Sequence, residues 1–221
     1  MISELISIFA SLVALVFAIT THEAAHGAVA LAFGDDTAKR ANRLSFNPLR
    51  HVDPLGTIML PAMLFLMKSP FLFGWAKPVP VNFSALKPRK LGSIAVALAG
   101  PGVNIFLAWL SAVLLHINGD MNTLGNEILL NSFQINLVLA VFNLLPLLPL
   151  DGGRILVEVL PFRLGQAYAK TETYAPLILL FLLLTPTALG AIGIDFNPLR
   201  MTMMPPLNLL RNGVLFLSGH Q

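Results

Sequence analysis

The chain contains no cysteine and few charged residues. Only 11% of its 221 residues are Asp, Glu, Lys or Arg, whereas 56% are hydrophobic, and the mean hydropathy is +0.76. These values lie outside the usual range for soluble globular domains, so the composition predicts a polytopic membrane protein. Without cysteine the chain can form neither disulfides nor thiolate metal ligands. Any metal site must therefore be built from histidine and carboxylate side chains.

The sequence also lacks internal boundaries. No Ser/Gly-rich linker, charge block, low-complexity tract or repeat divides it, which predicts one integral domain over residues 1–221. The first twenty residues contain Glu4 but no Lys or Arg, so they lack the basic start of a cleavable signal peptide, and we expect this segment to be retained. Although the net charge is +3, the basic residues are spread between apolar stretches, which argues against a nucleic-acid partner.

Several apolar segments are long enough to cross a bilayer, which requires about 20 helical residues. The long segments are 5–33, 91–117, 127–149 and 173–194. A shorter apolar segment covers 56–73. The segments 74–90 and 203–218 are ambiguous, and we assign neither to the membrane. The pattern predicts an all-α membrane protein with about four to six membrane helices, in which residues 5–154 form a core and 173–218 the C-terminal helices.

Basic residues are concentrated in three connections between these segments. Twelve of the 14 Lys and Arg lie in 39–50, 68–90 and 154–170, whereas the connection 118–126 has Asp120 and no Lys or Arg. The positive-inside rule then puts 34–55 and 152–171 in the cytoplasm and both the N-terminus and 118–126 outside. A cysteine at Thr123 that could be labelled only from the cytoplasm would contradict this orientation.

The first apolar segment contains His22, Glu23 and His26, in the pattern H-E-A-A-H. Residues four apart share one face of a helix, so both imidazoles can bind one ion, with the Glu beside them as a base. Ionisable side chains inside a bilayer cost about 2.5 kcal/mol or more each unless they are paired or bind a metal. The pattern therefore predicts Zn²⁺, one per chain. The alternative is a helix with two histidines in a wet cavity between helices.

Catalytic zinc usually has three protein ligands, and Asp151 is the best candidate for the third. Pro146 and Pro149 precede it and Gly152 and Gly153 follow it, so the helix is interrupted around a single carboxylate. Broken backbone at membrane depth is typical of a buried or cavity-lining site. The alternative is an ordinary helix end with a solvated Asp.

These residues resemble the site-2 protease family, the zinc metalloproteases of the membrane. Its members carry a His-Glu-x-x-His helix and, far downstream, an Asn and an Asp-Gly pair in a Pro-interrupted segment, which here correspond to Asn143, Asp151 and Gly152. Further motifs resemble the small prokaryotic branch, namely Asn47-Pro48, Asp53 to Thr57, Gly74 to Pro80, and Ala99-Gly100-Pro101 with Asn104. The resemblance implies a zinc metalloendopeptidase of the prokaryotic cell (inner) membrane that cleaves transmembrane proteins or peptides. It also implies a partly embedded β-hairpin between the first two long helices.

For the chemistry we expect zinc to activate a water molecule and Glu23 to act as general base. Asn143 is the candidate donor to the oxyanion, with helix packing as its alternative role. Gly100 and Gly102 are expected to allow close helix approach, with Asn104 either bonding a neighbour or lining the cleft. The remaining histidines, His51, His116 and His220, are expected to be solvated and away from the metal.

The three predicted ligands can share an ion only if they lie at the same depth in the membrane. This requires residues 56–90 to enter the bilayer and return, so that Asp151 arrives in the cytoplasmic half beside His22 and His26. Residues 79–83 are then expected to be extended, with an edge that could bind an unwound substrate by strand addition.

Two other functions remain open from the sequence. A transporter or channel also uses broken helices and buried polar groups, but it should show inverted repeats, and none is visible. A family member that has lost catalysis would bind membrane proteins without cleaving them. The presence of Glu23 beside the histidines argues against it, because zinc held only for structure needs no base.

Overall fold

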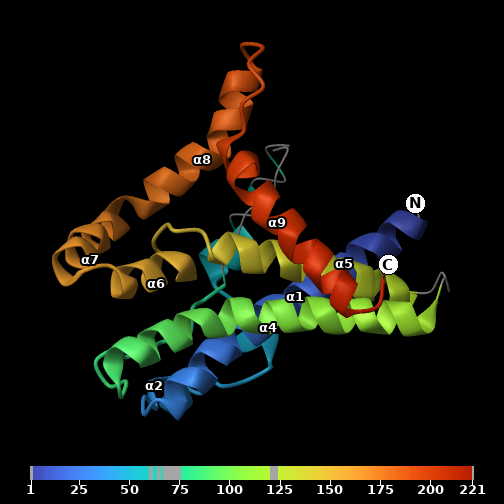
Figure 1. Ribbon diagram of the computed structural model, residues 1–221. Coiled ribbons are helices and arrows are strands. Elements are labelled where there is room, and N and C mark those ends of the chain that lie inside the picture. The colour runs from blue at the N-terminus through green and yellow to red at the C-terminus, as the bar shows by residue number, and fades with distance from the viewer. Residues whose placement is uncertain (1, 60–61, 64–65, 67–75, 120–123, 221) are drawn as a thin grey trace.

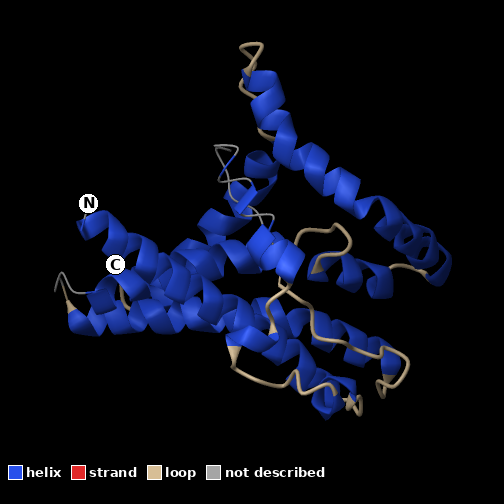
Figure 2. Ribbon diagram, turned by 180° about the vertical axis from the view of Figure 1, so that it is seen from behind, coloured by secondary structure: helices blue, strands red, loops and turns tan. Residues whose placement is uncertain are grey.

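A computed structural model describes residues 2–59, 62–63, 66, 76–119 and 124–220 (Figure 1). The described residues form helices and loops, with no β-strand among them (Figure 2). Four of the helices are long and apolar enough to cross a membrane: Ile6–Ala32, Arg89–Asn118, Leu124–Asn143 and Phe162–Gly190. The all-helical fold class and the lower end of the predicted number of membrane helices thus hold for this part of the chain.

The helices after α4 follow one another with short connections, whereas a long connection joins α1 to α4. The long ones are α1 (Ile2–Ala32), α4 (Arg89–Asn118), α5 (Leu124–Asn143), α8 (Ala175–Gly190) and α9 (Pro198–Leu217). The short helices are α2 (Thr37–Arg40), α6 (Asp151–Val159) and α7 (Phe162–Ala169), with 3₁₀ turns at Pro48–Arg50 and Lys170–Tyr174 and a π-helical turn at Pro54–Met59.

Helices α1, α4 and α5 pack side by side as the centre of the molecule (Figure 1). Small residues lie in the contacts, including Ala10, Ala14 and Ala18 of α1, which are at most 3% exposed. Large apolar side chains such as Phe9 and Phe17 are instead half exposed on the same helix. This is the arrangement expected in lipid, where close backbone approach rather than burial of large apolar groups holds helices together.

The connection between α1 and α4 starts and ends at the same end of this bundle. The N–H of Lys87 donates to the carbonyl of Phe33 at 2.9 Å, so the residue after α1 lies beside the approach to α4. Helix α5 then runs back toward this end, where α6 begins (Figure 1). The arrangement is the one required for residues of α1 and α6 to meet.

The predicted β-hairpin is not found in the described residues, which omit 60–61, 64–65 and 67–75. Residues 76–83 have no strand partner, and the reason is chemical. The N–H groups of Val79 and Asn82 donate to side-chain carboxylates instead of a neighbouring strand. The two prolines in the segment have no N–H to offer.

Beyond α6 the structure extends and corrects the predicted segments. The third apolar segment ends as a helix at Asn143 rather than 149, and the fourth membrane helix begins at 162 rather than 173 because α7 and a 3₁₀ turn lead into α8. Residues 203–218, which the sequence left unassigned, lie almost entirely in α9. This helix packs across α4 and α5, with Val214 buried against Ala108 and Phe133.

Candidate metal centre

Three side chains that are far apart in the sequence meet where α1 passes the start of α6. The Nε2 atoms of His22 and His26 are 3.0 Å apart, and they lie 3.3 and 3.5 Å from Oδ2 of Asp151. His22 and Asp151 are buried and His26 is half-buried. Among the described residues these three form a group of side chains that could hold a metal ion.

The spacing of these atoms suits zinc. A tetrahedral zinc ion with bonds of about 2.0–2.1 Å to nitrogen and oxygen separates its ligand atoms by about 3.3–3.4 Å. The three separations, 3.0, 3.3 and 3.5 Å, bracket this value. Three protein ligands also leave the fourth position for water or substrate, as in catalytic zinc sites.

Hydrogen bonds fix the ring orientation of both histidines. Nδ1 of His26 is 2.7 Å from the carbonyl oxygen of Val96, and since a carbonyl can only accept, this nitrogen carries the proton. Nδ1 of His22 donates in the same way to Oδ1 of Asn104 at 2.6 Å. When both rings are neutral, the two Nε2 atoms present lone pairs to each other and to a carboxylate, an arrangement that a cation between them stabilises.

The orientation of Asn104 is itself set by a chain of amides. Ser132 offers a backbone carbonyl that accepts from Nδ2 of Asn136 at 2.8 Å, which turns Oδ1 of Asn136 toward Asn104. Nδ2 of Asn104 donates to that oxygen at 2.7 Å, which leaves Oδ1 of Asn104 facing His22. Asn104 and Asn136 are both fully buried. A backbone carbonyl on α5 thus determines, through Asn136 and Asn104, which ring nitrogen of His22 carries the proton.

Gly100 on α4 makes room for the two imidazoles. A Cβ atom at this position would lie 2.4 Å from Cε1 of His22 and 2.5 Å from Nε2 of both His22 and His26. Gly102 differs, because a Cβ there would meet nothing within 4 Å. The prediction that both glycines allow close approach therefore fits Gly100, and the structure gives Gly102 no such role.

Asp151 is held at the first residue of α6 by a tight turn that only glycine permits. A Cβ on Gly152 would lie 2.2 Å from the carbonyl oxygen of Leu144, and one on Gly153 would lie 2.5 Å from the nitrogen of Leu148. Within the described part of the chain, buried Oδ2 of Asp151 makes no hydrogen bond, although both histidine nitrogens lie close. A buried carboxylate oxygen without a hydrogen-bond partner is the expected state of a metal ligand.

Glu23 lies one residue from His22 and is half-buried. Its Oε2 accepts the backbone N–H of Val79 at 2.8 Å, so the extended segment 76–83 runs directly past this carboxylate. The contact fixes the position of one carboxylate oxygen.

A second carboxylate holds the same extended segment. Asp35, in the turn after α1, is 1% exposed, and its Oδ2 accepts the N–H of Asn82 at 2.7 Å. Burial alone would raise the pKa of Asp35, but hydrogen bonds from Thr37 and Asn82 and the charge of Arg40 lower this pKa below its ordinary value. The ionised form of Asp35 is therefore the one that anchors the segment beside Glu23.

Other residues singled out from the sequence lie elsewhere. Asn143 ends α5, and its amide donates to the carbonyl of Leu139 in its own helix at 3.0 Å. Asp53 caps the turn that follows it by accepting the N–H of Leu55 and Gly56.

The expectation of solvated histidines is wrong for His51. This side chain is 3% exposed, and its Nε2 is 2.9 Å from the carbonyl of Ser45, because the loop folds back over the ring. His116 is exposed at the far end of α4, where its ring packs against that of His220.

Sequence reasoning missed Asn136, Ser132 and Asp35. The first two carried a signal, since polar side chains inside an apolar helix commonly bond a neighbouring helix. Asp35 carried none, because an acidic residue just after a helix is most often solvated, and its partner Asn82 lies 47 residues away.

Comparison of the sequence with known proteins identifies its family. The chain is 38% identical over 214 residues to a Bacillus subtilis protein named "Putative zinc metalloprotease YwhC". This match covers 92% of this chain and 88% of the relative. This chain belongs to peptidase family M50. The family model itself matches residues 115–186, which include Asn143 and Asp151. The predicted resemblance to site-2 proteases is therefore confirmed.

Two other relatives match over a smaller share of their length. A Mycobacterium tuberculosis protein named "Putative zinc metalloprotease Rip2" is 32% identical over 76% of this chain and 64% of its own. "Zinc metalloprotease MJ0392" of Methanocaldococcus jannaschii is 34% identical over 44% of this chain and 28% of its own. No solved structure matches the chain.

Proposed function

We propose that this M50 peptidase is an intramembrane zinc metalloprotease, which hydrolyses peptide bonds of membrane proteins within or near the bilayer. Family membership makes the chain a zinc metalloprotease. The observation that carries the finer proposal is the group formed by His22, His26 and Asp151, with ligand atoms 3.0–3.5 Å apart. Both histidines lie on α1, which is long and apolar enough to cross a membrane.

In this proposal His22, His26 and Asp151 hold the metal, and Glu23 is the general base. Zinc, when bound, polarises a water molecule and the carbonyl of the scissile peptide bond. Glu23 takes the proton from that water and returns it to the leaving amine. The N–H of Val79 supports this role, because it fixes Oε2, and among the described residues no hydrogen bond occupies the other carboxylate oxygen, which can receive the proton.

Asn143 is proposed as the donor to the developing oxyanion, a role that contributes roughly 3 kcal/mol in other proteases. Its amide now bonds Leu139, so the side chain must turn away from its own helix when substrate binds.

The substrate is proposed to approach in an extended form beside residues 76–83. A helical substrate must first unwind there, because its carbonyls are occupied by its own hydrogen bonds. Strand addition at this segment can use its carbonyls, since the N–H groups of Lys77, Val79 and Asn82 already have partners.

The centre is proposed to lie nearer the cytoplasmic face. His26 precedes the end of α1 at Ala32 by six residues, which is about 9 Å along a helix. The basic segment 39–50 follows this end, and basic connections favour the cytoplasm. Labelling of a single cysteine at Thr123, which lies outside the described residues, tests the orientation: it should react from outside the cell, and reaction from the cytoplasm alone would contradict it.

The test of the activity is cleavage of a model transmembrane substrate by the purified protein in detergent or vesicles. Wild-type protein should cleave, and 1,10-phenanthroline should abolish the activity. Glu23→Gln should keep zinc and lose cleavage, whereas Asp151→Asn should lose both because the amide cannot offset the charge of Zn²⁺. Asp53→Asn is the matched control for the second variant, since Asp53 only caps a turn.

These variants separate the proposal from the other functions. A non-cleaving scaffold would bind its partners equally well as wild type and as Glu23→Gln, and neither protein would release a product. Wild-type rates in Asp151→Asn would show that the ligand assignment is wrong.

A further inference from the structure

An open surface cavity lies beside the loop after α2, and none of the three predicted metal ligands lines it. Its volume is about 320 Å³, which is within the lower range of small-molecule sites. The residues that line it are Ala41, Asn42, Arg43, Leu49, Arg50, Val52 and Lys77. Three of them are cationic and none is acidic.

Arg43 is the feature that requires a ligand. This residue is 9% exposed, and Nη1 of its guanidinium is buried without a hydrogen-bond partner among the described residues. By contrast, Arg40 on α2 forms an ion pair with Asp36, and Arg50 donates to the carbonyl of Asn42 at 2.8 Å. A buried cation without a partner is costly, so the cavity around Arg43 is suited to an anion.

Among the described residues, no carboxylate pairs with Arg43. The two nearest acids along the sequence already have partners, since Asp36 pairs with Arg40 and Asp35 accepts the N–H of Asn82. Asp53 accepts the N–H groups of Leu55 and Gly56. The sequence then contains no Asp or Glu until Asp120, so the long connection between α1 and α4 cannot supply one. The anion must therefore come from outside this part of the chain.

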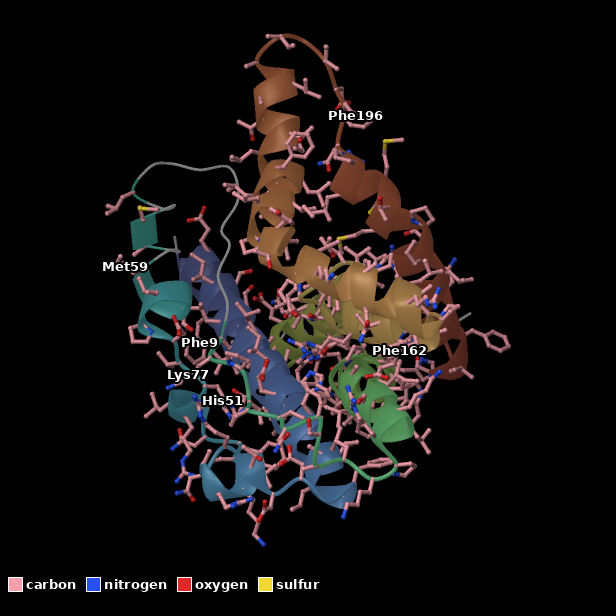
Figure 3. All side chains as sticks on the ribbon, turned by 90° about the vertical axis from the view of Figure 1, so that its left-hand side faces the viewer. Phe9, His51, Met59, Lys77, Phe162 and Phe196 are labelled. Carbon is pink, nitrogen blue, oxygen red and sulfur yellow. The ribbon has the colours of Figure 1, made fainter. Side chains whose placement is uncertain are left out.

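Lys77 is held at the cavity by the backbone. Its N–H donates to the carbonyl of His51 at 2.8 Å, and the two residues lie together beside α1 (Figure 3). The Lys77 side chain is exposed, so its ammonium group is available at the mouth of the cavity.

The surroundings of the cavity indicate which anion binds. Phe46 and Leu49, in the same loop, are 73% and 77% exposed, and Leu55 and Met59 in the next turn are 57% and 59% exposed. Large apolar side chains around a cationic site at a membrane surface match the two parts of a phospholipid, acyl chains and a phosphate. We propose that this cavity binds the phosphate group of an anionic phospholipid from the adjacent leaflet.

Free phosphate shares this chemistry, and the experiment distinguishes the two sources. The full-length protein, purified in detergent, is examined by native mass spectrometry with phosphatidylglycerol, with phosphatidylcholine and with inorganic phosphate. We expect one phosphatidylglycerol to be retained in preference to phosphatidylcholine, and inorganic phosphate not to displace it. Equal retention of the two lipids, or binding of phosphate without the lipid, would overturn the proposal.

Variants locate the bound lipid. Arg43→Gln should weaken phosphatidylglycerol retention roughly tenfold or more, as expected for loss of a charge-assisted contact. Lys77→Gln, a change at an exposed side chain, should weaken it less and guards against misfolding of the first variant. Arg40→Gln is the matched control, because it removes the same charge from a neighbouring side chain that is already paired.

Zinc content of each variant checks that the protein is folded, since none of these residues belongs to the metal centre. An equal loss of lipid in Arg40→Gln and Arg43→Gln would show that charge in general, rather than the cavity, attracts the lipid, and the proposal would be wrong.

Discussion

Gly100→Ala is the substitution that tests the packing of the metal centre most sharply. The added methyl would lie 2.4 Å from Cε1 of His22 and 2.5 Å from Nε2 of both histidines. Ordinary contacts between such atoms are about 3.5 Å or more, so the two rings or α4 must move by roughly 1 Å. Metal sites tolerate deviations of only about 0.2 Å in their ligand distances.

The expected loss follows from this mismatch. Displacement of reacting groups by about 1 Å commonly costs on the order of 100-fold, so zinc affinity and cleavage should fall by at least this factor. The helix itself should not suffer, because Ala in a helix interior is more favourable than Gly by about 1 kcal/mol. The defect should therefore be specific to the metal.

Competition with a chromophoric chelator measures the zinc affinity, and circular dichroism checks the helix content. Gly102→Ala is the matched control two residues along α4, where a methyl meets nothing within 4 Å, and it should bind zinc as the wild type does. If Gly100→Ala kept wild-type zinc affinity, the close approach of α4 to the histidines would not hold in solution.

Three further substitutions test residues around the centre. Asn104→Leu should lower zinc affinity about 10- to 100-fold by chelator competition, because His22 loses the acceptor that fixes its ring; unchanged affinity would remove this role. Asp35→Ala should lower the free energy of unfolding by about 2–4 kcal/mol, against less than about 1 kcal/mol for Asp36→Ala. Since the pKa of Asp35 is lowered in the folded protein, the contribution of its ionised carboxylate to the free energy of unfolding should be complete above pH 3.8 and should disappear as acid protonates this carboxylate. A difference in unfolding free energy between Asp35→Ala and wild type that does not change with pH would contradict this. Gly153→Ala should disturb the turn before α6 and reduce zinc content, whereas Gly190→Ala, with open space around it, should not.

The sequence predicted the membrane helices and the metal group because their signals are local. Long apolar runs determine helices in lipid, and the spacing of His22 and His26 places both on one helix face. Asp151 followed by elimination, since no other acid had both an interrupted helix and the required membrane depth. These inferences need only the chain near each residue and the number of ligands that zinc requires.

What the sequence did not predict depends on contacts between distant helices. The sequence indicates only that Gly100 allows helices to pack closely; the structure shows that the neighbours in question are the imidazoles of His22 and His26. Asn136 acts on His22 only through Asn104. The predicted hairpin is not found among the described residues for a related reason, because Glu23 and Asp35 accept the N–H groups of Val79 and Asn82.

X-ray absorption at the zinc edge, on the purified full-length protein, tests the central claim most directly. It should show two imidazole nitrogens and carboxylate oxygen at about 2.0–2.2 Å from a single zinc ion, with Glu23→Gln unchanged. Asp151→Ala should lose the carboxylate oxygen or the metal altogether. A protein without zinc, or a zinc ion without two histidine ligands, would contradict the account.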